Sequence, residues 1–196
     1  MLLIEPVTLE GAHVHLEPLS AAHIEGLRVA AGEPGLEALW FTSVPTPDGV
    51  AGEIESRLAQ WEAGTMNPWA IRRLPDHRVV GMTSFCGIDQ PNRRVEIGHT
   101  WLAPSAQRSA VNTEAKLLLL GHAFEACDAI AVEFRTHWHN HRSRAAIARL
   151  GAKQDGVLRS HRISPDGSLR DTVVFSIIAP EWPAVRMGLR ARLQTG

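Results

Sequence analysis

The chain has 196 residues, a formal net charge of −1, and 44% hydrophobic and 21% charged residues. This length suits one sizeable core and is short for two, so we expect a single domain over residues 1–196. The near-neutral charge argues against nucleic-acid binding through bulk electrostatics. The sequence has neither a signal-peptide pattern nor an apolar run near the roughly 20 residues of a membrane helix, which predicts a cytoplasmic protein that does not bind membranes.

The N-terminal part of the chain has the pattern of one strand followed by helices. Polar and apolar residues alternate at 13–19, which is typical of a strand. Ser20 suits an N-cap and Gly32 suits a helix stop. Farther on, apolar residues recur every three or four positions, which indicates an amphipathic helix. Helices are expected at residues 20–32, 33–41 and 50–64.

Strand patterns dominate the middle of the chain, where turn residues separate three apolar runs. Pro75 and Asp76 form one turn signal, and residues 89–94 turn the chain again. These signals predict an antiparallel meander of three strands. The strands are expected at residues 68–74, 78–88 and 95–103.

The last third alternates helix and strand before it closes on a hairpin. A parallel pair formed across the first of these helices would require a right-handed crossover. Asp166 and Gly167 are a strong hairpin signal. Helices are expected at 113–128, 141–151 and 180–193, and strands at 129–137, 152–163 and 170–178. The whole pattern predicts an α/β domain with a mixed sheet.

Small and polar residues fill the connection AQRSAVNTEAK, residues 106–116, where a strand leads into a helix. Free N–H groups at a helix start, together with the helix dipole, make a site for anions such as phosphates. An ordinary loop is the alternative, because every strand-to-helix connection needs one.

Four stretches together resemble the GNAT N-acetyltransferases, and more narrowly the ribosomal-protein N-terminal acetyltransferases. They are VEIGHTWLAP, QRSAVNTEAK, NHRSRAAIARLGA and SPDGSLRDTVVFSIIAPEW, in that order along the chain. The resemblance implies a mostly antiparallel sheet of six to seven strands with one splayed parallel pair, flanked by helices. It also implies direct transfer of an acetyl group from acetyl-CoA, as co-substrate, to a primary amine such as a protein N-terminus or a small-molecule amine.

The resemblance further implies which residues hold acetyl-CoA. Ala110 and Asn112 stand where the family has glycines; Asn tolerates a left-handed backbone, whereas the Cβ of Ala narrows the approach of a phosphate. The backbone of Trp101 and Leu102 would pair with the pantetheine arm, although the Trp101 side chain could equally be a core aromatic. The loop residues expected at the pyrophosphate are Gln107, Arg108, Ser109, Ala110, Val111 and Asn112.

The helix after the next strand carries a second part of the implied site. Asn140 would reach the pantetheine arm, or act only as an N-cap, and both roles can hold together. Ser143 would lie near the coenzyme and could supply a proton to the departing thiolate, as could water or the incoming ammonium group. The chain has no Tyr, so the tyrosine acid common in this family is excluded.

Glu96 is the expected general base, with a solvated or ion-paired carboxylate as the alternative. His99 could also act near neutral pH, but its strand parity is opposite to that of Glu96, so we do not expect both to face the cleft. Trp40, Phe41, Phe85 and His99 are the expected acceptor contacts.

Other interpretations are weaker. His137, His139 and His141 alternate like ligands on a strand, but a helix starts at Asn140 and no carboxylate or Cys is nearby, so no metal is expected. An acetyl-CoA-binding sensor or weak enzyme is the main alternative. A nucleotide-binding protein would need a phosphate-loop motif that the sequence lacks. The acceptor stays open between a protein N-terminus, an aminoglycoside and a polyamine, and a homodimer stays open as well.

Overall fold

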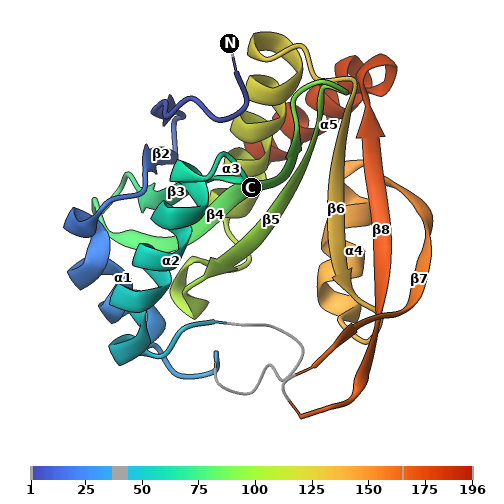
Figure 1. Ribbon diagram of the computed structural model, residues 1–196. Helices are drawn as coiled ribbons and strands as arrows, with labels where there is room; N and C mark the ends of the chain where they lie inside the picture. The colour runs from blue at the N-terminus through green and yellow to red at the C-terminus, as the bar shows by residue number, and fades with distance from the viewer. Residues whose placement is uncertain (1, 37–43, 165, 196) are drawn as a thin grey trace.

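The computed structural model describes residues 2–36, 44–164 and 166–195, which form one mixed sheet flanked by helices (Figure 1). The helices are α1 (Ile24–Ala31), α2 (Val50–Glu62), α3 (Ala110–Gly121), α4 (His141–Leu150) and α5 (Trp182–Thr195). The strands are β1 (Leu9–Glu10), β2 (Val14–Pro18), β3 (Met66–Arg73), β4 (Val79–Asp89), β5 (Arg94–Leu102), β6 (Ala131–His137), β7 (Lys153–Ile163) and β8 (Leu169–Ile178).

The sheet order is β1-β2-β3-β4-β5-β6-β8-β7, and every neighbouring pair is antiparallel except β5 and β6. The predicted mixed sheet with one parallel pair is therefore confirmed. The described residues form eight strands rather than six to seven, because the two-residue strand β1 adds to the edge through the pair Leu9–Leu16.

Helices cover both faces of the sheet, with α1 and α2 on the near side of Figure 1 and α4 and α5 behind β6 and β8. Of the short helix expected at 33–41, residues 33–36 form turns instead, and 37–41 lie outside the described residues. The third helix begins at Ala110, three residues before the expected start, because Ser109 caps it by accepting the Val111 N–H at 3.3 Å. Within the described chain, no helix is long and apolar enough to span a membrane.

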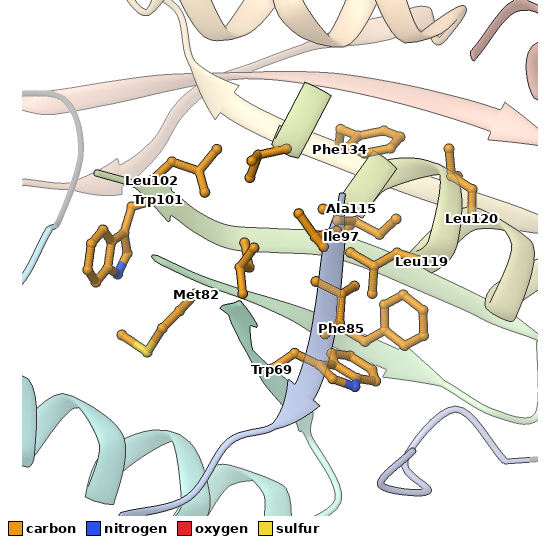
Figure 2. Close-up of a cluster of buried hydrophobic side chains, with 14 of the residues drawn as sticks. Trp69, Met82, Phe85, Ile97, Trp101, Leu102, Ala115, Leu119, Leu120 and Phe134 are labelled. Atoms are coloured by element: carbon orange, nitrogen blue, oxygen red, sulfur yellow. The ribbon is translucent and has the colours of Figure 1, made fainter. Parts of the chain in front are cut away.

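The main core lies where the central strands meet α3 (Figure 2). Trp69 of β3 and Phe85 of β4 are fully buried and pack edge to face, with ring centroids 5.0 Å apart. The apolar run in α3 supplies Leu119 and Leu120, which are also fully buried. This packing fixes α3 against the sheet, so the start of the helix has a defined position beside β5.

A buried carboxylate ties α3 to the N-terminal segment. Glu114 accepts the backbone N–H groups of Ala12, His13 and Val14 at 3.0, 2.6 and 2.8 Å. Gly11 makes room for this group, since a Cβ there would lie 2.4 Å from Glu114 Oε2. The N-terminal strand therefore braces the helix whose first turn was expected to bind phosphates.

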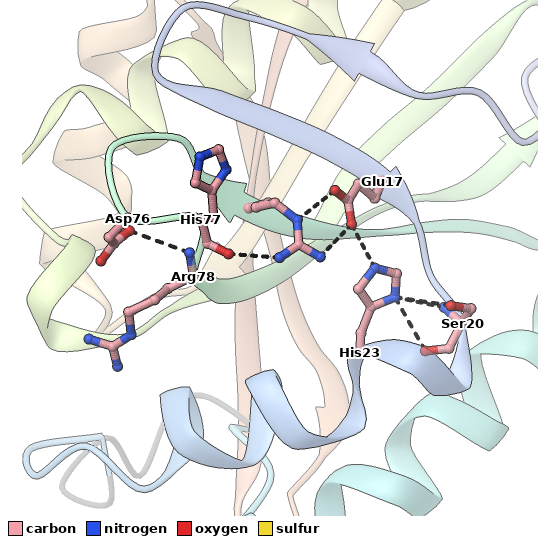
Figure 3. Close-up of polar contacts among 7 residues, drawn as sticks. Glu17, Ser20, His23, Asp76, His77 and Arg78 are labelled. Carbon is pink, nitrogen blue, oxygen red and sulfur yellow. Dashed lines mark hydrogen bonds and ion pairs between the residues drawn. The ribbon is translucent and has the colours of Figure 1, made fainter.

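A second polar group joins β2, β3 and the start of α1 (Figure 3). Arg72 donates to both carboxylate oxygens of Glu17, at 2.6 and 2.9 Å, and His23 Nε2 lies 2.9 Å from Glu17 Oε2. The hydrogen bonds from Arg72 are the main cause that lowers the pKa of Glu17 to about 2. This group lies at the opposite end of the sheet from β7 and stabilises the fold there.

Replacing Glu114 with Gln should destabilise the protein, because the amide nitrogen cannot accept and at least one buried N–H loses its partner. We expect a loss of about 2–3 kcal/mol in the free energy of unfolding, measured by urea denaturation. The exposed Glu25→Gln variant, which breaks only a surface ion pair with Arg28, is the control and should change stability by less than about 0.5 kcal/mol. Equal effects of the two changes would show that the tether contributes little.

Candidate active site

The parallel strands β5 and β6 pair over only three register pairs, from Arg94–Ala131 to Glu96–Glu133. Beyond these pairs the strands diverge, and a cleft of about 710 Å³ opens between them. Residues from both strands, from α3 and α4, and from the β7–β8 hairpin line it. Among these lining residues are 96–102, Gln107, Asn112, Lys116, 134–137, Asn140, Ser143, His161, Arg162, Arg170 and Thr172.

A β-bulge in β5 shapes one wall of the cleft. Ser84 pairs with Gly98 and Met82 with Trp101, so β5 holds one residue more than β4 over this stretch. His99 takes the extra conformation, with φ +50°. Because the added residue resets the alternation of side chains, Glu96 and His99 both line the cleft. The expectation that strand parity would separate them is therefore wrong.

The bulge is held from α2 by a buried arginine. Arg57 is 2% exposed and donates through Nη1 to the His99 carbonyl and to Ser84 Oγ, both at 3.1 Å. Its Nε donates to Glu53 at 2.7 Å, which satisfies the charge. Burial lowers the pKa of His99, and the Arg57 charge lowers it further, so His99 is largely neutral at pH 7.

Glu96 lies at the point where the parallel pairing ends. Its side chain is 18% exposed, and Arg135 Nε is 3.6 Å from Oε2. Burial raises the pKa of the Glu96 carboxyl, and the neighbouring Glu133 raises it further, whereas nearby arginines oppose this rise. Gly98 keeps the space beside the carboxylate open, since a Cβ there would lie 2.7 Å from Glu96 Oε1. This arrangement is a base with room for a reacting group.

The start of α3 differs from the expected loop in its backbone. The left-handed residue is Arg108, with φ +57°, and not Asn112, which lies inside α3. Ala110 is the first residue of the helix, so its Cβ causes no backbone strain. The Val111 side chain belongs to the core, and its N–H is accepted by Ser109 Oγ. A pyrophosphate would therefore bind the neighbouring first-turn N–H groups.

Gln107 connects the loop to both walls of the cleft. Its Nε2 donates to the Leu102 carbonyl at 3.0 Å, and its Oε1 accepts from Arg142 of α4 at 3.3 Å. Gln107 thus holds the end of β5 and the start of α4 together. Arg108 and Ser109 are exposed beside it.

Asn140 caps α4, as expected, by accepting the Ser143 N–H through Oδ1 at 3.0 Å. The capping bond leaves Nδ2 as the part of the amide that can reach a ligand. Asn140 and Ser143 both line the cleft, opposite β5. Gly151 ends the helix in a left-handed conformation, with φ +103°.

The Trp101 side chain is the strongest sign that a ligand fits this cleft. It is 6% exposed and lines the cleft, and its indole Nε1 is a buried donor that has no hydrogen-bond partner among the described residues. A buried unpaired N–H is costly, so a ligand carbonyl at this position would be stabilising. The amide carbonyls of a pantetheine arm are acceptors of this kind.

Lys116 of α3 is a buried amine in the cleft wall. Its Nζ donates to Thr100 Oγ1 at 2.8 Å and to Thr83 Oγ1 at 3.4 Å, and it is 6% exposed. No carboxylate of the described residues lies within ion-pair distance of it. Burial without a counter-charge lowers the pKa of Lys116 to about 7. The ammonium and the neutral amine are thus both populated near neutral pH.

The structure corrects part of the expected acceptor site. Phe85 is fully buried and stacks on His122, with ring centroids 6.0 Å apart, so it is a core residue and not an acceptor contact. Trp40 and Phe41 lie outside the described residues. Among the residues that are described, no group of three or more His, Cys, Asp or Glu side chains is placed to hold a metal ion.

The sequence interpretation missed three features of the cleft. A signal for Lys116 existed, since it is the one charge next to the apolar run LLLL of α3. Arg162 and Arg170 flank the predicted turn symmetrically, which could have paired them across the hairpin. Arg57 gave no signal, because an arginine in an amphipathic helix is normally solvated.

Comparison with known proteins agrees with this geometry. Residues 13–153 match the family model described as an acetyltransferase (GNAT) domain. YdaF of Bacillus subtilis (strain 168), a protein provisionally named a ribosomal N-acetyltransferase, is 28% identical over 145 residues, which is 73% of this chain and 78% of YdaF. The match covers most of the chain, so the protein belongs to the GNAT acetyltransferase family and is an N-acetyltransferase.

Two solved structures share the fold over nearly the whole chain. One, provisionally titled an acetyltransferase and from T. thermophilus, has a TM-score of 0.83 and 37% identity, and covers 96% of this chain and 98% of its own. RimJ of Mycobacterium smegmatis, solved with CoA-disulfide, has a TM-score of 0.82 at 22% identity, and covers 98% of this chain and 97% of its own. The GNAT family as a whole transfers acetyl groups from acetyl-CoA.

Replacing Lys116 with Met should change how stability depends on pH. In the wild type, the unfolded chain binds the Lys116 proton up to pH about 10.5, whereas the folded protein releases it at about 7. The free energy of unfolding should therefore rise with pH between these values, by at most about 1.4 kcal/mol per pH unit. The cost of burial is fully present below pH 7, so Lys116→Met should be most stabilising there.

Urea denaturation at several pH values from 6 to 10 measures this difference. The exposed residue Lys153, which pairs with Glu181, provides the control variant Lys153→Met. Its stability curve should stay parallel to that of the wild type across the window. A parallel curve for Lys116→Met as well would mean that Lys116 remains protonated in the folded state.

Proposed function

We propose that this protein transfers the acetyl group of acetyl-CoA directly to a primary amine, with Glu96 as the general base. The cleft between the diverging strands β5 and β6 carries this proposal. It joins the start of α3, which suits a pyrophosphate, to a buried carboxylate with open space beside it. Family membership supports the cofactor, and the geometry supports the assignment of residues.

The coenzyme and the acceptor would enter from opposite faces of the sheet. On β6, Val132 and Phe134 pack into the core with Ile147 of α4, so residues of the other parity face away from this helix. Glu133, Arg135 and His137 have that other parity. Asn140 and Ser143 of α4 would therefore contact the coenzyme, while Arg135 and His137 face the acceptor. Both ligands can then be bound at once, as direct transfer requires.

When bound, acetyl-CoA supplies the acetyl group as a thioester. Glu96 accepts the proton that the acceptor ammonium must lose, and the free amine then forms the new C–N bond as the C–S bond breaks. Its raised pKa suits this role, because a stronger base holds the proton better near neutral pH. Backbone N–H groups of the splayed part of β5 would stabilise the negative charge on the carbonyl oxygen.

The departing sulfur needs little help from the protein. A thiol has a pKa near 8.5, so the thiolate is a moderate leaving group. Ser143 is half-buried in the cleft wall and would donate a proton or carry one from water. The chain has no Tyr for this step, so Ser143 is the side chain that we assign to it.

Glu96→Gln should leave acetyl-CoA affinity unchanged and lower kcat by roughly 10²–10⁴, the range for loss of a general base. The acidic limb of the wild-type pH–rate profile should lie above the ordinary Glu pKa of 4.5 and vanish in the variant. The register partner Glu133 gives the control Glu133→Gln, which should keep the limb but shift it to lower pH. A Glu96→Gln enzyme with the wild-type profile would exclude Glu96 as the base.

Ala110→Trp tests the coenzyme end of the cleft separately. A large side chain on the first residue of α3 would obstruct phosphates at the helix start, so the Kd for acetyl-CoA should rise at least about tenfold, or ~1.4 kcal/mol. Titration calorimetry measures this change. Unaltered affinity in the folded variant would contradict the assignment of this helix start to the pyrophosphate.

A further inference from the structure

Two arginines face each other across the β7–β8 hairpin. Arg162 of β7 and Arg170 of β8 are register partners, and both line the cleft. Like charges directly opposite each other destabilise a sheet. The strand β7 also has a register shift between Leu158 and Arg162, with Ser160 at φ +48°, which sets the direction of this end of the strand. The two guanidinium groups are thus held together at a structural cost.

Neither arginine has a carboxylate partner among the described residues, in contrast to its neighbours. Arg159, on the same hairpin, pairs with Asp171, and Arg135 pairs with Glu133 at 2.9 Å. The Arg170 Nε is buried and makes no hydrogen bond with any described residue. Burial lowers the pKa of Arg170, and the charge of Arg162 lowers it further. A buried donor on a charged group of this kind is stabilised by an anion.

The pair lies on the acceptor side of the cleft. His137 of β6 is the register partner of Thr172 of β8, and Arg170 lies two residues beyond Thr172 on the same face. Glu96 is close enough to these groups that the charges of Arg135, Arg162 and Arg170 all act on its carboxyl. An amine that reaches Glu96 therefore enters a region where arginines outnumber carboxylates.

This charge balance restricts the acceptor. A polyamine or an aminoglycoside would bring only positive charge to a site that already holds three guanidinium groups, and it would be repelled. An amine that also carries a carboxylate or phosphate would neutralise the pair and supply the acceptor that Arg170 Nε lacks. Arginine suits both anions, because its planar N–H groups form paired hydrogen bonds with their oxygens.

We propose that Arg162 and Arg170 bind an anionic group on the acceptor, so that the substrate is an amine bearing a carboxylate or a phosphate. This inference rests on the proposed N-acetyltransferase function and specifies the class of its acceptor. The pair determines specificity, and Glu96 performs the proton transfer.

Turnover of matched acceptors tests the proposal. Each pair differs only in the anion: amino acids against their amides for the carboxylate, and phosphoethanolamine against ethanolamine for the phosphate. In the wild type, at least one type of anionic amine should have a kcat/KM at least tenfold above its neutral partner and above spermidine. This ratio should fall below about threefold in Arg170→Met and in Arg162→Met. Arg159→Met, on the same hairpin, should keep the wild-type ratio.

A binding measurement decides the matter even if none of these amines is acetylated. Inorganic phosphate is titrated into protein saturated with coenzyme A, so that the coenzyme's own phosphate site is filled. The wild type and Arg159→Met should bind phosphate at least tenfold more tightly than Arg170→Met. Arg162 is exposed, so Arg162→Met keeps this test available if Arg170→Met fails to fold.

The outcomes separate this proposal from the proposed function. Efficient acetylation of spermidine with no preference for anionic amines would overturn the anion site and leave the N-acetyltransferase activity standing. Phosphate binding that depends on Arg170, in a protein that acetylates no amine, would support the anion site and count against the activity. Equal phosphate affinity in the wild type and Arg170→Met would overturn the anion site.

Discussion

Parallel pairing between β5 and β6 covers three register pairs and ends at Glu96 and Glu133, and the cleft depends on this short pairing. The bulge at His99 changes the course of β5 just beyond the last pair, and Arg57 holds the bulge from α2. On the other side, β6 stays paired with β8 along its whole length. One strand is thus drawn toward β4 and the other toward β8, so the gap between them is a property of the sheet and needs no loop to keep it open.

The same opening explains the unusual electrostatics of the cleft. Side chains that would face a helix or solvent in a continuous sheet instead face a partly enclosed space, where water screens them less. The pKa of the Glu96 carboxyl rises there, and the pKa of the Lys116 amine falls, both mainly through burial. Both changes bring proton exchange toward neutral pH, which is where acetyl transfer to an amine requires it.

Local signals predicted much of the fold and only part of the site. Turn residues and apolar periods identified the meander, the hairpin and the Asn140 cap, because each depends on neighbours in sequence. The bulge at His99 was not predictable, since a regular alternation gives no sign of one inserted residue. Phe85 has the residue type of a binding contact, and only the packing of Trp69 and His122 around it makes it a core residue.

The irregular strand β7 also affects how the protein behaves toward other copies of itself. It is the last strand of the sheet, and an edge strand normally offers a row of N–H and C=O groups to any extended chain. The register shifts at Gln154–Gly156 and at Leu158–Arg162 interrupt this row, and Lys153, Arg159 and Arg162 place positive charge along it. The edge that carries the arginine pair is therefore a poor template for strand addition, and it favours a protein that stays dispersed at high concentration.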